Sequence, residues 1–365
     1  MLLLKHNNLD FNDLIIIERQ YLRWLRSNRS FVTSEFNVLD CSRIDLYGHL
    51  LGMFAKLDIL TTLNITPSQL LDFLIDLDCA YHSTPYHSFY HAVDIVTVLY
   101  FTITELDARA CFTNKEIAIL FIAAVCHDVG HPGFNNDFQI RTQSELAQRY
   151  QNISVLESYS IDLSLDLIQR HNLFQTDCHD MFRRLILSTD MAYHFELLEK
   201  AYKGKDLAEI LLHAADISNT VRVWPISKQW SDLIVQEFFE QGDAERLLSL
   251  PVSPGMDRHL ASQANISLRF GDFIVRPYFE AIQKLLPKAS VWIQALEENR
   301  IEWEKKREQT PKSISRHQSV SVPAGTVLLP SLRRVSRASS HSNIFVPPSS
   351  LSSELRRNSV QPIIS

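Results

Sequence analysis

The sequence contains few glycines, scattered cysteines and no long apolar run. Nine glycines among 365 residues are too few for the many tight turns of a β-rich protein, so they favour long helices. The five cysteines, at positions 41, 79, 111, 126 and 178, are odd in number and show no CxxC spacing. We therefore expect reduced core thiols in an intracellular, cytoplasmic protein. No apolar run reaches the length of about 18 residues that a transmembrane helix needs, and the first residues make a poor signal peptide.

Charge is unevenly distributed along the chain. The formal net charge is −6, but residues 310–365 contain seven Lys and Arg against one acid, Glu354. A tail charge of +6 leaves −12 on residues 1–309, which disfavours nucleic acid as a partner of the main body. Hydrophobic residues make up 45% of the chain, which is enough for a sizeable core.

The apolar pattern predicts an all-α protein. From residue 13 to about residue 305, apolar residues recur at three- and four-residue spacing, and no stretch alternates strictly. We expect a helical lead-in over residues 1–35, a compact multi-helix domain over 36–305, and a disordered, basic, Ser-rich tail over 306–365.

Histidine and aspartate gather in a few short motifs. "YHSFYHAVD" contains His87 and His91 four residues apart, so on a helix they would share one face. "VCHDVGHPG" follows an apolar run and repeats this spacing with His127 and His131. A single histidine on an apolar helix is usually a hydrogen-bonded core residue, whereas adjacent His127 and Asp128 are typical of an HD-type phosphohydrolase. Two imidazoles and two carboxylates suit Zn²⁺, Mn²⁺ or Fe²⁺.

Several longer motifs together resemble the catalytic domain of class I cyclic nucleotide phosphodiesterases. They are "YHSFYHAVDIV", "HDVGHPGFNNDFQIRTQSELAQRYQNISVLE", "LSTDM", "HAADISN", "SKQWSDLIVQEFFEQGD" and "FGDFIVRPYFE", in this order between about residues 40 and 305. The resemblance implies hydrolysis of 3′,5′-cyclic nucleotides to 5′-monophosphates with two divalent ions, Zn²⁺ at the first site and Mg²⁺ or Mn²⁺ at the second.

The resemblance also implies a role for individual residues. His87 is the implied general acid that protonates the leaving O3′. The implied ligands of the first metal are His91, His127, Asp128 and Asp216, and Asp128 also bridges to the second metal. The implied holders of the second metal's waters are His131, Glu157 and Thr189. The positions implied to line the nucleotide pocket are Tyr86, Asn219, Ile234, Ser267 and Phe270, with Phe270 and Ile234 on opposite faces of the purine.

The sequence departs from the family pattern in three places. Ser88 replaces the asparagine that usually follows the general acid, and residues 158–160 replace an Asn and two histidines. We expect these two changes to tune activity rather than abolish it. Ser267 stands where the family has a glutamine that pairs with the purine edge, and Gln263, one helical turn earlier, is a candidate substitute.

The tail contains two sites for cyclic-AMP-dependent kinase, "RRVS" and "RRNS", with Ser336 and Ser359 as candidate phosphoacceptors. Feedback by this kinase favours cyclic AMP over cyclic GMP as the substrate. A homodimer is compatible with the sequence. The alternatives left open are another HD-superfamily phosphohydrolase and a catalytically weak cyclic-nucleotide-binding protein.

Overall fold

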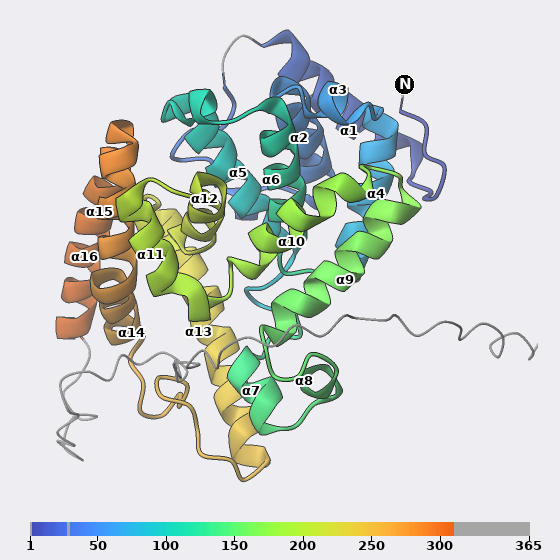
Figure 1. Cartoon of the computed structure of the whole chain (residues 1–365). Helices are drawn as coiled ribbons and strands as arrows, with labels where there is room; N and C mark the ends of the chain where they lie inside the picture. The colour runs from blue at the N-terminus through green and yellow to red at the C-terminus, as the bar shows by residue number, and fades with distance from the viewer. Residues whose placement is uncertain (1, 28–29, 310–365) are drawn as a thin grey trace, which may run out of the picture. The chain divides into compact units, whose positions relative to one another are not determined.

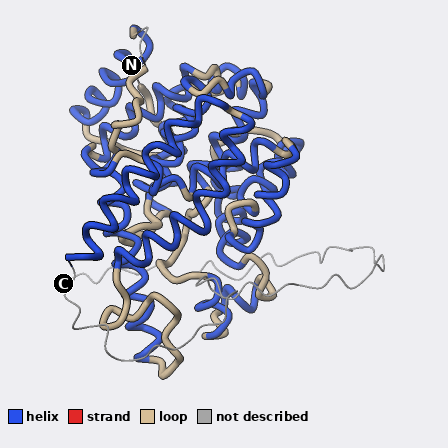
Figure 2. Tube along the Cα trace, turned by 90° about the vertical axis from the view of Figure 1, so that its left-hand side faces the viewer, coloured by secondary structure: helices blue, strands red, loops and turns tan. Residues whose placement is uncertain are grey.

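The computed structural model describes residues 2–27 and 30–309, which form helices joined by loops (Figures 1 and 2). No strand occurs in these residues, so the predicted all-α class is confirmed. The α-helices are α1 (Phe11–Arg26), α2 (Arg43–Lys56), α3 (Ile59–Leu63), α4 (Pro67–Ala80), α5 (Phe89–Glu105), α6 (Asn114–Cys126), α7 (Asn136–Arg141), α8 (Glu145–Arg149), α9 (Val155–Arg170), α10 (His179–Leu187), α11 (His194–Lys203), α12 (Leu207–Asp216), α13 (Trp224–Leu247), α14 (Gln263–Phe270), α15 (Arg276–Leu285) and α16 (Ser290–Gln309). Residues 306–309, which were predicted to be part of the disordered tail, continue helix α16, and residues 310–365 lie outside the described residues.

Helix α1 shares a hydrophobic core with the helices that follow it. Ile17 and Trp24 are fully buried, and α1 packs along α2. Gly52 of α2 permits this approach, because a Cβ atom there would lie 2.1 Å from Cγ of Trp24. Gly48, one turn earlier, lies similarly close to Gln20. The domain boundary expected at residue 35 stays a prediction.

Helices α5, α6 and α12 pack against one another at the centre of the fold. Every residue of α6 from Ile117 to Cys126 is buried, which explains the apolar run in the sequence. A capping box between Thr113 and Glu116 fixes the start of α6. Because three core helices meet here, the residues at their ends are held in fixed positions.

A buried ion pair joins α5 to the segment after α12. Nη1 of Arg222 lies 2.6 Å from Oδ1 of Asp94, and both side chains are almost inaccessible to solvent. Nη2 of Arg222 also donates to the carbonyl of Phe36. Removing one partner of such a pair costs about 3–5 kcal/mol, because the other charge stays buried and unpaired.

A polar network around Glu245 attaches the segment after α13 to α13 and α7. Glu245 is buried and accepts hydrogen bonds from the backbone N–H of Ser253 (2.5 Å) and its hydroxyl (2.6 Å). Arg141 of α7 reaches the same carboxylate at 3.1 Å. Gly242 lies so close to Met256 that a Cβ atom would be 1.9 Å from the Met256 carbonyl oxygen. The chain after α13 therefore folds back onto that helix.

The cysteines are free, but they are not all in the core. Cys126 and Cys178 are buried, whereas Cys79 and Cys111 are exposed. The prediction of core thiols is therefore wrong for Cys79 and Cys111, which lie in the last turns of α4 and of a short 3₁₀-helix and face solvent. No helix within the described ranges combines the length and the apolarity that crossing a membrane requires.

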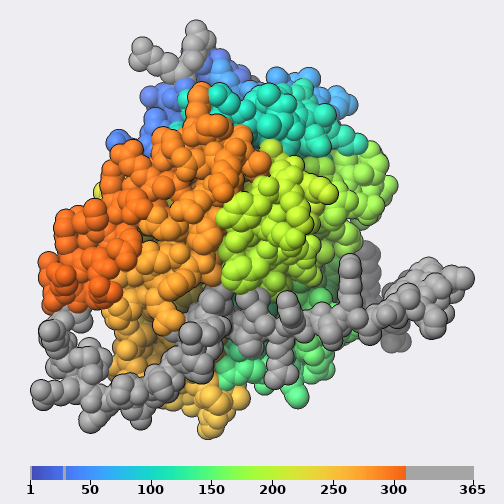
Figure 3. Space-filling model, turned by 60° about the vertical axis from the view of Figure 1, so that its left-hand side comes forward, coloured from blue at the N-terminus to red at the C-terminus, as the bar shows by residue number. Residues whose placement is uncertain are grey.

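A buried histidine pair lies where α11, α12 and α15 meet; α11 and α15 are neighbours on the face shown in Figure 3. Nδ1 of His194 lies 2.9 Å from Nε2 of His213, and the ring of Tyr278 packs against both. Burial lowers the pKa of His194 to about 3, with a further contribution from His213. Burial likewise lowers the pKa of His213 to about 4. Both imidazoles are therefore neutral in the folded protein at neutral pH.

We expect this pair to make folding sensitive to acid. Both folded-state pKa values lie below the ordinary value of 6.5, so below that pH the unfolded chain binds more protons and the folded state loses stability. Each histidine contributes a slope that rises to at most about 1.4 kcal/mol per pH unit as the pH falls below 6.5. Urea unfolding between pH 7.5 and 5 should show a shallower pH dependence for His194→Asn than for the wild type. The exposed His259 supplies the control, since His259→Asn should keep the wild-type slope; equal slopes in all three proteins would contradict the account.

Candidate active site

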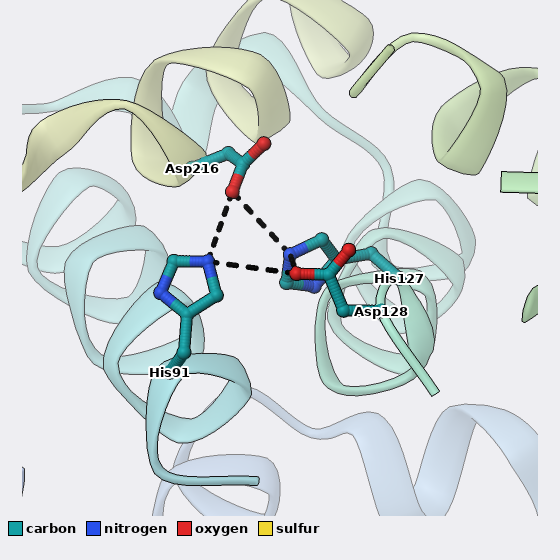
Figure 4. A group of neighbouring side chains, drawn as sticks. All are labelled: His91, His127, Asp128 and Asp216. Carbon is teal, nitrogen blue, oxygen red and sulfur yellow. Dashed lines mark hydrogen bonds and ion pairs between the residues drawn. The ribbon is translucent and has the colours of Figure 1, made fainter. Parts of the chain in front are cut away.

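Four side chains from three core helices converge at one point (Figure 4). His91 lies in the first turn of α5, His127 and Asp128 directly follow α6, and Asp216 is the last residue of α12. One ligand atom from each residue lies within 4.8 Å of the others. The two histidines are inaccessible to solvent, and the two carboxylates are mostly buried.

The distances describe a compact set of two imidazoles and two carboxylates. Nε2 of His91 lies 3.0 Å from Oδ1 of Asp216 and 3.7 Å from Oδ2 of Asp128. Nε2 of His127 lies 2.9 Å from Oδ2 of Asp128 and 3.4 Å from Oδ1 of Asp216. All four contacts involve atoms that can coordinate a metal ion.

The cluster fits a divalent cation. Nδ1 of His127 donates to the Ala124 carbonyl at 2.9 Å, which leaves the lone pair of Nε2 directed at the carboxylates. Nε2 of His127 and Oδ2 of Asp128 are buried and have no hydrogen-bond partner of good geometry among the described residues. Burial would raise the pKa of Asp216, but the adjacent His127 and His91 imidazoles outweigh it and lower that pKa. Ionised carboxylates beside a buried acceptor nitrogen make a site for a cation.

Helix ends and turns bring these histidines to the site, whereas the sequence predicted shared helix faces. His87 precedes α5, which starts at Phe89, so His87 and His91 do not share a helix face. Likewise, α6 ends at Cys126, and His127 and His131 lie in the turn that follows. The helix-face interpretation was wrong for both pairs, because the helices begin or end inside the motifs.

His87 is oriented by a carboxylate to which the sequence had assigned no role. Oε2 of Glu237 accepts the backbone N–H groups of Tyr86 (3.0 Å) and His87 (3.2 Å), and Oε1 contacts Nδ1 of His87. Burial alone would lower the pKa of His87, but Glu237 outweighs it and raises that pKa to about 9. Glu237 is buried on α13, 150 residues away in the chain, and in the sequence it looks like one more acid in a charged helix.

Of the residues expected around a second metal, His131 and Glu157 lie close enough to Asp128 for their charges to interact with it. The ring of His131 stacks on that of His87 at 3.9 Å. Glu157, in the first turn of α9, accepts hydrogen bonds from Asn136. Burial, and then the nearby Asp190 carboxylate, raise the pKa of Glu157 to about 8. The Thr189 hydroxyl donates to the Ile186 carbonyl within its own turn.

Tyr86 and Asn219 lie at the edge of the cluster. The amide of Asn219 contacts the Tyr86 hydroxyl, and the Tyr86 ring packs on His91 and Trp230. Ile234 and Phe270 are partly buried side chains on the main hydrophobic core.

Ser267 belongs to a small polar group between α13 and α14. Its hydroxyl lies 3.0 Å from that of Ser231. The amide nitrogen of Gln263 donates to the Ser231 hydroxyl (3.1 Å) and to Asp232 (2.7 Å). The carboxamide of Gln263 is therefore held against α13, next to Ser267.

Fold and site define a helical protein with a centre for divalent metal ions. The sequence model of the 3′,5′-cyclic nucleotide phosphodiesterase family matches residues 86–296. The chain is 32% identical over 328 residues to the mouse 3′,5′-cyclic-AMP phosphodiesterase 4C, covering 80% of this chain and 47% of that protein. It is 32% identical over 274 residues to the human high affinity cGMP-specific 3′,5′-cyclic phosphodiesterase 9A, covering 69% of this chain and 46% of that protein.

A solved structure shows the same fold. It is the phosphodiesterase domain of the RhoPDE fusion protein from the choanoflagellate Salpingoeca rosetta, with a TM-score of 0.71, 27% identity, and coverage of 79% of this chain and 98% of that domain. The chain belongs to the 3′,5′-cyclic nucleotide phosphodiesterase family. It spans about half the length of the curated relatives given above.

We expect Asp216→Asn to abolish tight metal binding. The substitution keeps the shape of the side chain but removes a negative ligand charge. Loss of groups that only support a ligand costs about 10–100-fold in metal affinity, so loss of a ligand should cost at least about 100-fold. Titration of metal-free protein with Zn²⁺ against a chelator measures this. Asp78→Asn, which alters a carboxylate bonded to Tyr47, is the matched control and should bind like the wild type; equal affinities for Asp216→Asn and the wild type would contradict the site.

Proposed function

We propose that this chain hydrolyses 3′,5′-cyclic nucleotides to nucleoside 5′-monophosphates in a metal-dependent reaction, with cyclic AMP as the first choice of substrate. The observation that carries the proposal is the convergence of His91, His127, Asp128 and Asp216, with His87 held close by. Family membership supports the same reaction.

We assign Zn²⁺ to these four residues and Mg²⁺ or Mn²⁺ to a second site that shares Asp128. His131, Glu157 and Thr189 would hold the waters of the second ion. Bound ions of this kind lower the pKa of a water and stabilise charge that develops on a phosphoryl group. The raised pKa of Glu157 beside Asp190 supports a cation there, because these two neighbouring buried carboxylates have no positively charged partner among the described residues.

His87 supplies the proton in this proposal. Hydrolysis breaks the bond between phosphorus and O3′ and adds a water oxygen to phosphorus, so O3′ must receive a proton. Nδ1 of His87 contacts Glu237, which leaves Nε2 as the donor to O3′. Glu237 holds the ring in this orientation through its contacts with the backbone and the ring.

The nucleotide would lie between α13 and α14. Ile234 and Phe270 would contact the two faces of the purine. Tyr86 and Asn219 would lie at the rim of the pocket. The edge of the base would face a polar group made of Ser267, Ser231 and the Gln263 carboxamide. A serine hydroxyl cannot make the bidentate contact of a glutamine, so we expect weak discrimination between adenine and guanine.

Three further predictions concern regions and properties beyond the site. Ser336 and Ser359 lie outside the described residues, so their phosphorylation by cyclic-AMP-dependent kinase stays a prediction. A homodimer and a cytoplasmic location are also still predictions.

Hydrolysis of cyclic AMP and cyclic GMP, measured side by side with Mg²⁺ or Mn²⁺, tests the activity and the role of position 267. We expect turnover of both nucleotides by the wild type and none by Asp216→Ala. Ser267→Gln should change the ratio of the two kcat/KM values by about tenfold, because a bidentate contact is worth about 1–3 kcal/mol. Asn265→Gln, an exposed position on the same helix, is the control and should leave the ratio unchanged. Turnover of linear phosphoesters alone would favour another HD-type hydrolase, and metal binding without turnover would favour a binding protein.

The role of His87 is tested by changing the leaving group. His87→Asn should lower kcat for cyclic nucleotides by about 10²–10⁴-fold, the usual contribution of a general acid. A phosphodiester that releases p-nitrophenolate needs little protonation, so its hydrolysis should fall far less. Glu237→Gln should also slow the hydrolysis of cyclic nucleotides more than that of the p-nitrophenyl phosphodiester, but by a smaller factor than His87→Asn. Equal losses for both substrates would mean that His87 acts on something other than the leaving group.

A further inference from the structure

The turn after α6 carries His127, Asp128 and His131, so its position decides where three side chains of the site lie. The turn contains Gly130 at a φ of +78°, where a Cβ atom would collide with Leu163. Such a left-handed residue favours glycine and sets the direction in which the chain leaves the helix. A turn of this kind is held in place only if the groups around it fix its backbone.

Part of the backbone of this turn is satisfied locally. The Ala124 carbonyl accepts from Nδ1 of His127, and the Cys126 carbonyl accepts from the N–H of Val129 at 3.0 Å. The Asp128 carbonyl accepts from the N–H of His131 at 3.0 Å. These bonds shape the turn, but they do not attach it to the rest of the protein.

Two buried hydroxyl groups from distant segments make that attachment. The hydroxyl of Tyr81, directly after α4, donates to the Val125 carbonyl at 2.8 Å and accepts the backbone N–H of Asp128 at 3.4 Å. The hydroxyl of Ser160, in α9, donates to the Val129 carbonyl at 2.9 Å. Both side chains are buried, so water does not compete for these bonds. The Tyr81 hydroxyl thus holds the backbone up to Asp128, and the Ser160 hydroxyl holds the backbone directly after it.

We propose that Tyr81 and Ser160 are positioning residues that set the affinity of the His127–Asp128 turn for its divalent cation. Neither hydroxyl needs to touch the ion, because each acts through the backbone of the ligands. A metal centre tolerates ligand displacements of only about 0.5 Å, so a loosened turn binds more weakly. The inference rests on the proposed metal dependence.

Substitutions that remove only the hydroxyl groups separate positioning from packing. Tyr81→Phe keeps the ring, which packs against Phe89, and leaves the Val125 carbonyl and the Asp128 N–H without this partner. Ser160→Ala removes one oxygen from α9. Two controls make the same chemical changes elsewhere, and the first, Tyr47→Phe, removes a hydroxyl bonded to Asp78.

The second control, Ser164→Ala, removes a fully buried hydroxyl one turn further along α9. That hydroxyl faces the Cys126 thiol rather than the backbone of the turn. Both controls therefore report the general effect of losing a buried hydroxyl near the same helices.

The experiment measures the dissociation constant for Zn²⁺ by chelator competition on the full chain, together with the thermal unfolding of the metal-free proteins. We expect Tyr81→Phe and Ser160→Ala each to weaken Zn²⁺ binding by about tenfold, the usual size of an effect transmitted through a ligand's supporting contacts. The double variant should lose more than either single one. Ser160→Thr keeps the hydroxyl and should restore most of the affinity. Tyr47→Phe and Ser164→Ala should bind like the wild type.

The possible outcomes separate the metal site from the positioning role. If the wild type binds no Zn²⁺, the metal site fails, and this inference fails with it. If the wild type binds tightly and Tyr81→Phe and Ser160→Ala bind equally well, the metal site stands and the positioning role is overturned. The positioning role is also overturned if the controls weaken binding as much as the two test variants, since the effect would then be one of general stability.

Discussion

The burial of Asp128 and Asp216 beside His91 and His127 is the constraint on which this structure depends. Two ionised carboxylates in a pocket of a helical core are costly to bury unless a positive charge compensates them. The two imidazoles contribute acceptor nitrogens, and the bond from His127 to the Ala124 carbonyl fixes one of them in that role. A divalent cation bound among them would satisfy all four groups at once.

The fold meets this constraint by placing helix ends at the site. α6 ends at Cys126 and α12 ends at Asp216, so the negative ends of two helix dipoles lie near the expected cation. Asp94 and Arg222 hold the segment after α12 against α5, and the network at Glu245 holds α13 in place. Stability of the core and geometry of the site therefore rest on the same contacts.

Apolar periodicity predicted the helical class, and the resemblance of the short motifs to a known family predicted the side chains of the cluster. The sequence could not predict that the motifs lie where helices begin and end, since helix-face reasoning assumes an uninterrupted helix. The role of Glu237 was not predicted for a different reason. Glu237 contacts His87 across 150 residues of chain, and nothing in the sequence around Glu237 indicates that contact. The exposure of Cys79 and Cys111 likewise depends on which side of a helix end faces solvent.

The most direct test of the central claim is the anomalous diffraction of crystals of the Zn²⁺-loaded protein, recorded at the zinc edge. The account predicts the strongest anomalous peak among His91, His127, Asp128 and Asp216, at about 2.0–2.2 Å from nitrogen and oxygen ligands. A map without a peak at this position, or with zinc held only by other side chains, would contradict it.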